Sequence, residues 1–248
     1  MKIRSIVSVF TIFFSTILFV SCDNAQSPKG ADTTSPFKKI TYTEWKEEAK
    51  TNIRLLPKYG HLPKTDEQKD ADRELIETYV KQQGTRSKAS AVLIDLGFDY
   101  LARMDIKTAM YRFNQAWLLD STNVDTYWGF GAIYHTLGDY KRAMEQYDIG
   151  LSVDPKNPRI ITDKATVYLV YYQLNNDLSN LINAITLLEQ SYIIDPQNQN
   201  TLFKLSICWF LKNDCKKARR YYKECMDLGG KPITLEFTNA LKEKCKEN

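Results

Sequence analysis

The chain has 248 residues, of which 43% are hydrophobic and 26% are charged, the ordinary composition of a soluble globular protein that can bury a core. Its 34 basic and 30 acidic residues give a formal charge of +4. Proteins that bind nucleic acid carry a concentrated basic surface, so this near balance argues against that class of partner. We therefore expect no nucleic-acid partner.

The first 21 residues have the pattern of a secretory signal peptide. Lys2 and Arg4 give a positive start, and the apolar run over 6–20 is shorter than the roughly 20 residues of a membrane span. The run ends at Ser21-Cys22, which resembles the lipobox of bacterial lipoproteins. This resemblance implies that residues 1–21 are removed and that Cys22 carries a lipid. An ordinary signal peptide with an incidental cysteine is the alternative.

The segment after the cysteine is expected to be a flexible tether over 22–37. Residues 23–36 lack any large apolar side chain and are rich in Pro, Gly, Ser, Thr and Asp. Such a segment cannot bury enough surface to offset the entropy of ordering it.

A helical lead-in is predicted over 38–89. The residues Thr41 to Glu44 and Thr65 to Gln68 both match the capping-box pattern, in which a threonine precedes a Glu or Gln by three places. The first helix is expected to run to about Ile53, before a stretch broken by prolines and glycine. The second helix is expected to end at Gly84.

From residue 90 onward the sequence repeats itself. Repeats one, two and four span 90–123, 124–157 and 199–232, with 34 residues each, and repeat three spans 158–198 and is seven residues longer. Three positions in each repeat, the eighth, twentieth and twenty-seventh, are always small, as close crossing of two helices requires. In repeat three the last two positions are counted back from its end, past the insertion. These residues are Gly97, Ala109, Ala116, Gly131, Ala143, Gly150, Ala165, Ala184, Ser191, Ser206, Ala218 and Cys225.

Large side chains recur between the small ones. The eleventh position is always aromatic, and the twenty-fourth is Phe113, Tyr147, Leu188 or Tyr222. This 34-residue pattern resembles the tetratricopeptide-repeat (TPR) family. The resemblance implies an all-α fold, a right-handed superhelix of about four antiparallel helix pairs. N-terminal lead-in helices precede the repeats, and a capping helix over 233–248 follows them.

The ends of the repeats supply helix caps. Asn123, Asn157 and Asn198 close the first three repeats, and each is placed to cap the helix that follows. The seven extra residues of repeat three are close to two helical turns, so we expect a lengthened hairpin that turns at Asn175 to Asp177. Three apolar residues near its tip, Tyr171, Tyr172 and Leu174, are expected either to contact a partner or to pack on one another.

The TPR resemblance also implies where a ligand binds, because ligands in that family meet the first helix of each pair. In this chain the groove positions are rich in aromatic side chains, which suits an apolar helix or an extended peptide. The alternative is that the lead-in or capping helices fill the groove. The predicted groove residues are Phe98, Leu101, Trp128, His135, Arg159, Phe203 and Phe210.

No catalytic constellation accompanies the two histidines, so we expect neither an enzyme nor a bound cofactor or metal. The cysteines after Cys22 are Cys208, Cys215, Cys225 and Cys245, which lack the close spacing of zinc ligands. Buried free thiols are the favoured interpretation, with one disulfide as the alternative. The basic run over 216–223 is interpreted as a solvated helix face, with contact to anionic headgroups or an acidic partner as the alternative.

Together these patterns predict a lipid-anchored protein–protein interaction scaffold of the bacterial cell envelope, in the outer membrane. Its partners are expected to be envelope proteins, which the sequence does not identify, and the membrane itself through the lipid. The alternative function is a glycan- or nutrient-binding lipoprotein of an outer-membrane uptake system.

Overall fold

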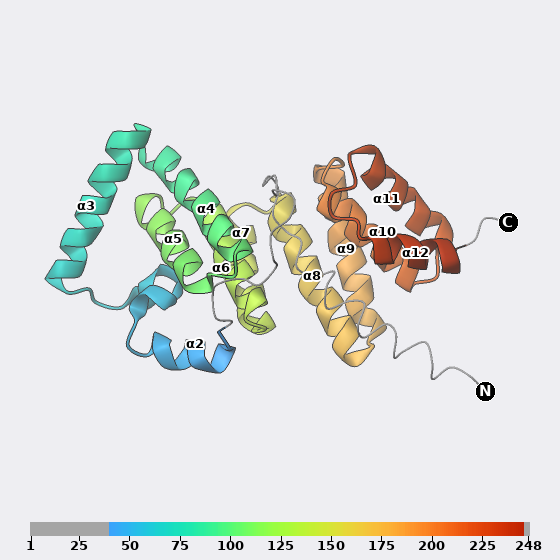
Figure 1. The fold of residues 1–248 in the computed structure, drawn as a ribbon, viewed down its shortest axis with the longest axis horizontal. Helices are drawn as coiled ribbons and strands as arrows, with labels where there is room; N and C mark the ends of the chain where they lie inside the picture. The colour runs from blue at the N-terminus through green and yellow to red at the C-terminus, as the bar shows by residue number, and fades with distance from the viewer. Residues whose placement is uncertain (1–39, 246–248) are drawn as a thin grey trace. The chain divides into compact units, whose positions relative to one another are not determined.

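The computed structural model describes residues 40–245. The predicted signal peptide, the Cys22 lipid site and the predicted tether lie outside the described residues. Within this range every regular element is a helix (Figure 1), which confirms the all-α prediction. The α-helices are α2 (Tyr42–Ala49), α3 (Asp66–Gln83), α4 (Arg86–Ala102), α5 (Ile106–Leu119), α6 (Asp125–Thr136), α7 (Tyr140–Val153), α8 (Pro158–Asn175), α9 (Leu178–Ile194), α10 (Gln199–Leu211), α11 (Cys215–Asp227) and α12 (Leu235–Lys244).

The described residues divide into two compact units. The N-terminal unit, residues 40–155, contains α2 to α7, and the C-terminal unit, residues 156–245, contains α8 to α12. Within each unit the helices pair with their neighbours in sequence: α4 with α5 and α6 with α7, then α8 with α9 and α10 with α11 (Figure 1).

The small residues lie where the paired helices meet. All twelve of the predicted small positions are buried. A Cβ atom on Gly97 of α4 would lie 2.4 Å from the Phe113 ring, and one on Gly129 of α6 would lie 2.5 Å from the same ring. Phe113 of α5 is therefore held between two glycines on two helices, and neither position has space for a side chain.

The second repeat uses the same contact. A Cβ atom on Gly131 would lie 2.2 Å from the ring of Tyr147, which is fully buried. In the third repeat the same two positions hold Ala165 and Leu188, both buried. The eighth position of the repeat is therefore glycine where the twenty-fourth is a buried aromatic residue. It is alanine where the twenty-fourth is a leucine.

The lead-in forms both predicted capping boxes, at Thr41 and at Thr65, and α3 ends at Gly84 with φ of 82°. The predicted length of the first helix is wrong, because α2 ends at Ala49. Two short 3-10 turns follow it, η2 (Ile53–Leu55) and η3 (Pro57–His61). Left-handed backbone at Lys58 to Gly60 prevents a regular helix there.

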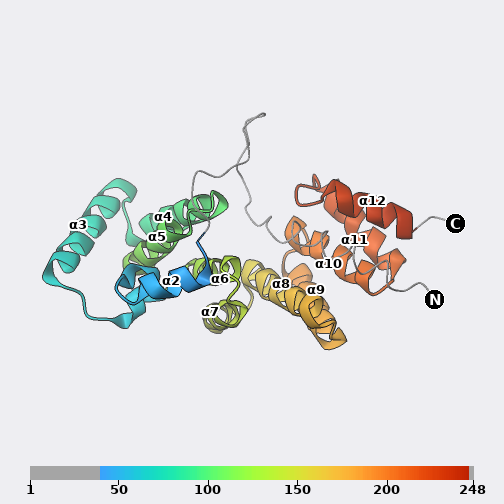
Figure 2. The same cartoon turned by 60° about the horizontal axis from the view of Figure 1, so that its bottom comes forward.

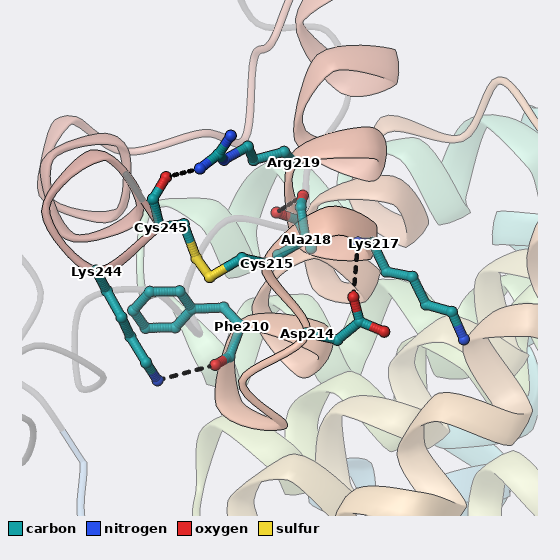
Figure 3. Close-up of a disulfide and its surroundings, with 9 residues drawn as sticks. Phe210, Asp214, Cys215, Lys217, Ala218, Arg219, Lys244 and Cys245 are labelled. Carbon is teal, nitrogen blue, oxygen red and sulfur yellow. Dashed lines mark hydrogen bonds between the residues drawn. A yellow bond between two sulfur atoms is a disulfide. The ribbon is translucent and has the colours of Figure 1, made fainter. Parts of the chain in front are cut away.

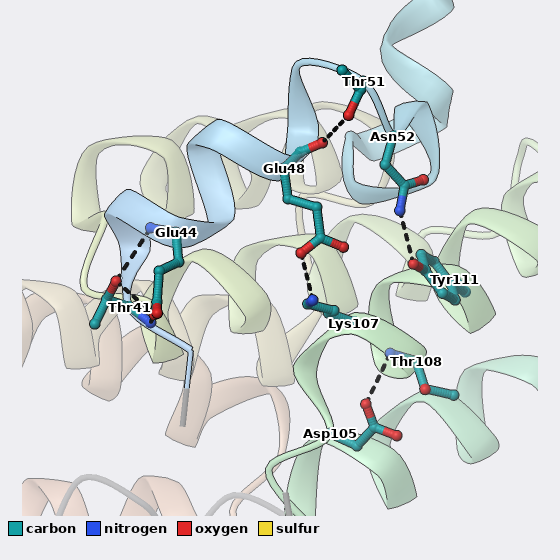
Figure 4. A network of polar contacts seen from close by, with 9 residues as sticks. All are labelled: Thr41, Glu44, Glu48, Thr51, Asn52, Asp105, Lys107, Thr108 and Tyr111. Atoms are coloured by element: carbon teal, nitrogen blue, oxygen red, sulfur yellow. Dashed lines mark hydrogen bonds and ion pairs between the residues drawn. The ribbon is translucent and has the colours of Figure 1, made fainter. Parts of the chain in front are cut away.

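Polar contacts fasten α2 and the two turns to the second helices of their neighbours. Figure 4 shows Glu48 paired with Lys107 of α5 and Asn52 donating to the Tyr111 hydroxyl over 3.0 Å. The buried Asn114 amide donates to the carbonyl oxygens of Arg54 and Leu56, at 2.8 and 3.0 Å. These carbonyl groups lie in irregular turns, so no regular α-helix supplies their hydrogen-bond donors. The asparagine amide supplies them instead.

Asparagines cap the helices that begin the last two repeats. Asn157 and Asn198 accept from the amides of Ile160 and Thr201 at the starts of α8 and α10. Asn123 accepts from the amide of Asp125, but the helix begins one residue later than predicted, with Val124 at the cap position.

The predicted lengthened hairpin is confirmed. The helices α8 and α9 have 18 and 17 residues, against 13 each in α10 and α11, and Asn176 adopts the left-handed conformation in the turn between them. Leu174 is exposed at the tip. Tyr171 and Tyr172 are half-buried, and Tyr172 packs against the core of this unit.

The contact between Gly131 and Tyr147 predicts a specific pair of effects. Gly131→Ala should lower the free energy of unfolding by about 1–3 kcal/mol, because the methyl group overlaps the ring. The double variant Gly131→Ala/Tyr147→Leu reproduces the residue pair of the third repeat. It should lose less stability than the sum of the two single variants in chemical denaturation. If the two losses simply add, then the contact between these two residues does not set the distance between α6 and α7.

Candidate interaction site

Two aromatic side chains meet on the first helices of the N-terminal unit. The rings of Phe98 on α4 and Trp128 on α6 lie 4.1 Å apart with an interplanar angle of 42°, and both residues are half-buried. Phe98 directly follows Gly97, and Trp128 directly precedes Gly129, the two glycines that hold Phe113. The close approach that these glycines allow therefore also brings the two aromatic rings together.

Two further predicted groove residues, Leu101 and His135, belong to the same two helices. Both are half-buried, and the His135 ring lies edge-on to Tyr140 with centroids 5.5 Å apart. Four of the seven predicted groove residues thus lie on α4 and α6 of one unit, on the first helix of each pair.

In this unit the side-chain hydrogen bonds and ion pairs of α2 and the two turns go to the second helices, while Lys58 of η3 also lies over the Tyr127 ring of α6, 5.3 Å from its centroid. Besides the contacts to Lys107, Tyr111 and Asn114 of α5, Arg142 at the start of α7 donates to the Tyr42 hydroxyl. Burial, followed by the hydrogen bond with Asp139, raises the pKa of Tyr42 to about 12, so this hydroxyl stays protonated at neutral pH. These contacts place α2 on the second helices of the pairs rather than on α4 and α6.

In the C-terminal unit, by contrast, the capping helix α12 covers predicted groove residues. Phe203 and Phe210 of α10 are buried, and their rings lie 5.4 and 5.6 Å from that of Phe237 on α12. Figure 2 shows α12 beside α10 and α11. Arg159, at the start of α8, is exposed. The alternative that a capping helix fills the groove therefore describes the fourth repeat.

A disulfide holds this capping helix in place. Cys215 at the start of α11 is bonded to Cys245 just after α12 (Figure 3). Arg219 donates to the carbonyl oxygen of Cys245, and the Lys244 ammonium donates to that of Phe210 over 3.1 Å. The favoured interpretation of free thiols is wrong for this pair.

The other two cysteines are buried free thiols, as the sequence indicated. Burial raises the pKa of Cys225 to about 11 and raises that of Cys208 further. Burial also lowers the pKa of Lys204 on the same helix as Cys208, and the charge of Asp163 opposes that shift. Because a thiolate is the reactive form, neither thiol is a nucleophile at neutral pH.

The basic run on α11 is not one continuous surface. Lys217 lies over the Trp209 ring, 3.6 Å from its centroid, and Arg219 bonds to the end of α12. Lys216, Arg220 and Lys223 are exposed, and Arg220 pairs with Glu224 at 3.4 Å.

Within residues 40–245 no helix combines the length and the hydrophobicity of a membrane-spanning segment. These residues also contain no group of three or more His, Cys, Asp or Glu residues placed to hold a metal ion.

The fold is the tetratricopeptide-repeat fold, as comparison with solved structures shows. A thermophilic TPR protein of Thermus thermophilus matches with a TM-score of 0.53 and 18% identity, over 62% of this chain and 80% of that one. PilF of Pseudomonas aeruginosa matches with a TM-score of 0.51 and 18% identity, over 64% of this chain and 67% of that one.

A chain of the Cut9–Hcn1 hetero-tetramer of the APC/C matches over 82% of this chain but 37% of its own length, with a TM-score of 0.51 and 16% identity. These identities are low, so the similarity establishes the fold alone. No protein-family model matches the sequence. No curated protein matches it either.

The cysteine arrangement predicts a clear pattern of alkylation. Native protein treated with iodoacetamide at pH 8 should show no adduct on Cys208 or Cys225, because both thiols are buried and protonated. Treatment with a dithiol reductant first should add adducts at Cys215 and Cys245, read by peptide mass spectrometry. Modification of Cys215 without prior reduction would contradict the disulfide.

Proposed function

We propose that this chain is a non-enzymatic interaction scaffold, anchored by a lipid in the bacterial cell envelope, that binds a segment of another envelope protein. The observation that carries the proposal is the pair of Phe98 and Trp128 on the first helices of the N-terminal unit. Half-buried aromatic side chains are typical anchors of protein interfaces, because they offer a large apolar area at little entropic cost.

The charges beside this pair favour one kind of ligand. Asp95 and Asp125 each lie one turn before the aromatic residue of their own helix, and Asp99 follows Phe98 directly. A segment with apolar residues for the rings and a Lys or Arg for the carboxylates would complement this surface. We therefore propose an apolar helix or extended peptide that carries a basic residue.

Replacement of the indole tests this proposal. Trp128→Ala should weaken binding of the co-purifying partner by roughly 30-fold, the effect of a central aromatic anchor. The partner is first identified by affinity purification from gently solubilised cell envelopes. Its affinity is then measured by titration against the wild type and the variant.

Trp117→Ala is the matched control, because Trp117 is also half-buried but lies on α5 and contacts His61. The control variant should bind as the wild type does, and both variants should keep the helix content of the wild type. If both variants lost the same affinity, the partner would not bind specifically at α4 and α6.

The proposed anchor rests on the sequence before residue 40. The positive start, the apolar run and the Ser21-Cys22 junction support acylation of Cys22. A lipid would attach the protein to a membrane without any spanning helix. We propose the outer membrane as the site of attachment.

Fractionation of cells tests the anchor. Wild-type protein should sediment with membranes, and its intact mass should exceed that of the chain from Cys22 by the mass of acyl groups. Cys22→Ser should move the protein into the soluble fraction, because the lipid on this one residue holds it at the membrane. Membrane sedimentation of the variant, together with an unmodified wild-type mass, would refute the lipoprotein interpretation.

A further inference from the structure

One aromatic residue and two lysines directly precede the described part of the chain. Phe37, Lys38 and Lys39 come just before residue 40, where the described structure begins. Residues 23–36 contain no large apolar side chain, so Phe37 is the only aromatic residue between Cys22 and α2. We name Phe37, Lys38 and Lys39 the cis segment.

The cis segment has the chemistry that the surface of α4 and α6 favours. On that surface the rings of Phe98 and Trp128 lie 4.1 Å apart. Asp95 on α4 is exposed, and Asp125 on α6 is half-buried. A further ring packs favourably on an aromatic pair, and ammonium groups complement carboxylates. The cis segment therefore matches this surface both in its apolar group and in its charge.

The cis segment can also reach this surface, because α2 begins beside the end of α6 (Figure 1). Arg142 donates to the Tyr42 hydroxyl at the start of α2, and its guanidinium lies 5.7 Å from the ring centroid of Tyr134 on α6. At 1.5 Å per residue, Trp128 lies about 9 Å along α6 from Tyr134. An extended chain from Tyr42 back to Phe37 spans up to about 16 Å, which covers this distance.

We propose that the cis segment occupies the surface of α4 and α6 in the free protein, and that a partner must displace it. This inference rests on the proposed function, because it assigns a built-in competitor to the same site. Three residues cover only part of the surface. A longer segment of a partner protein makes more contacts there and can replace them.

Attachment to the same chain makes a weak contact effective. A short linker gives the attached segment an effective concentration on the order of 1 mM. With a dissociation constant of about 0.1 mM for the free segment, about nine tenths of the molecules hold the cis segment in place, and the apparent affinity of any competing ligand falls about tenfold. The cis segment thereby rejects ligands that bind no better than it does.

Titration of a labelled peptide tests the inference. The probe is a synthetic peptide of residues 33–41, read by fluorescence anisotropy, and the protein is the full chain with Cys22→Ser. Adding Phe37→Ala/Lys38→Ala/Lys39→Ala to the protein should raise its affinity for the peptide about tenfold, because the cis segment no longer competes. Trp128→Ala in that variant should remove the gain, with no change in helix content.

Ser27→Ala/Pro28→Ala/Lys29→Ala is the matched control, since it also changes three residues before the fold and one lysine, but no aromatic residue. It should leave the peptide affinity unchanged. Equal affinity with and without the cis segment would overturn the inference, and so would a peptide that binds neither protein or that ignores Trp128→Ala. The proposed function fails on a different result, equal affinity of the co-purifying partner for the wild type and Trp128→Ala.

Photo-crosslinking locates the cis segment in the free protein directly. With p-benzoylphenylalanine in place of Phe37, irradiation should join this residue to peptides that cover 94–101 of α4 or 125–136 of α6 of the same chain. The crosslinked protein should keep the mass of one copy. Crosslinks confined to other peptides, or a product of twice the mass, would contradict occupation of the site by the chain's own segment.

Discussion

The ring of Phe113 lies between two glycines, and the N-terminal unit is organised around this contact. Gly97 and Gly129 each leave the ring less space than a methyl group needs, so α4, α5 and α6 approach to the distance that the ring sets. The sequence neighbours of these glycines, Phe98 and Trp128, are brought together on the same two helices. A packing constraint in the core thereby positions the aromatic surface that we propose binds a ligand.

The surface of the first helices is covered by a terminal helix in the C-terminal unit but not by α2 in the N-terminal unit. In the N-terminal unit α2 and the turns are fastened to the second helices, through Lys107, Tyr111 and Asn114. In the C-terminal unit α12 packs on the first helix α10, and the bond between Cys215 and Cys245 keeps it there. A repeat array exposes an apolar face at its end, and a disulfide-held cap is one way to cover it. The proposed ligand site accordingly belongs to the N-terminal unit.

Features that depend on local sequence were predictable. The repeat period, the small positions, the capping boxes and the turn at Asn176 each follow from a few neighbouring residues, whose conformational preferences decide the outcome. Features that depend on distant residues were not. The disulfide joins cysteines 30 residues apart, and spacing does not fix connectivity. The burial of Phe203, Phe210 and Tyr172 depends on packing within the folded unit, which periodicity does not encode.

Hydrogen–deuterium exchange of the protein with and without its purified partner tests most directly that the first helices of the N-terminal unit bind the ligand. The account predicts slower exchange on binding in the peptides that cover residues 94–101 of α4 and 125–135 of α6. It predicts unchanged exchange in α5, where α2 and the two turns are attached, and in α10, which α12 covers. Protection confined to α5, α10 or the tip of the α8–α9 hairpin would contradict the account.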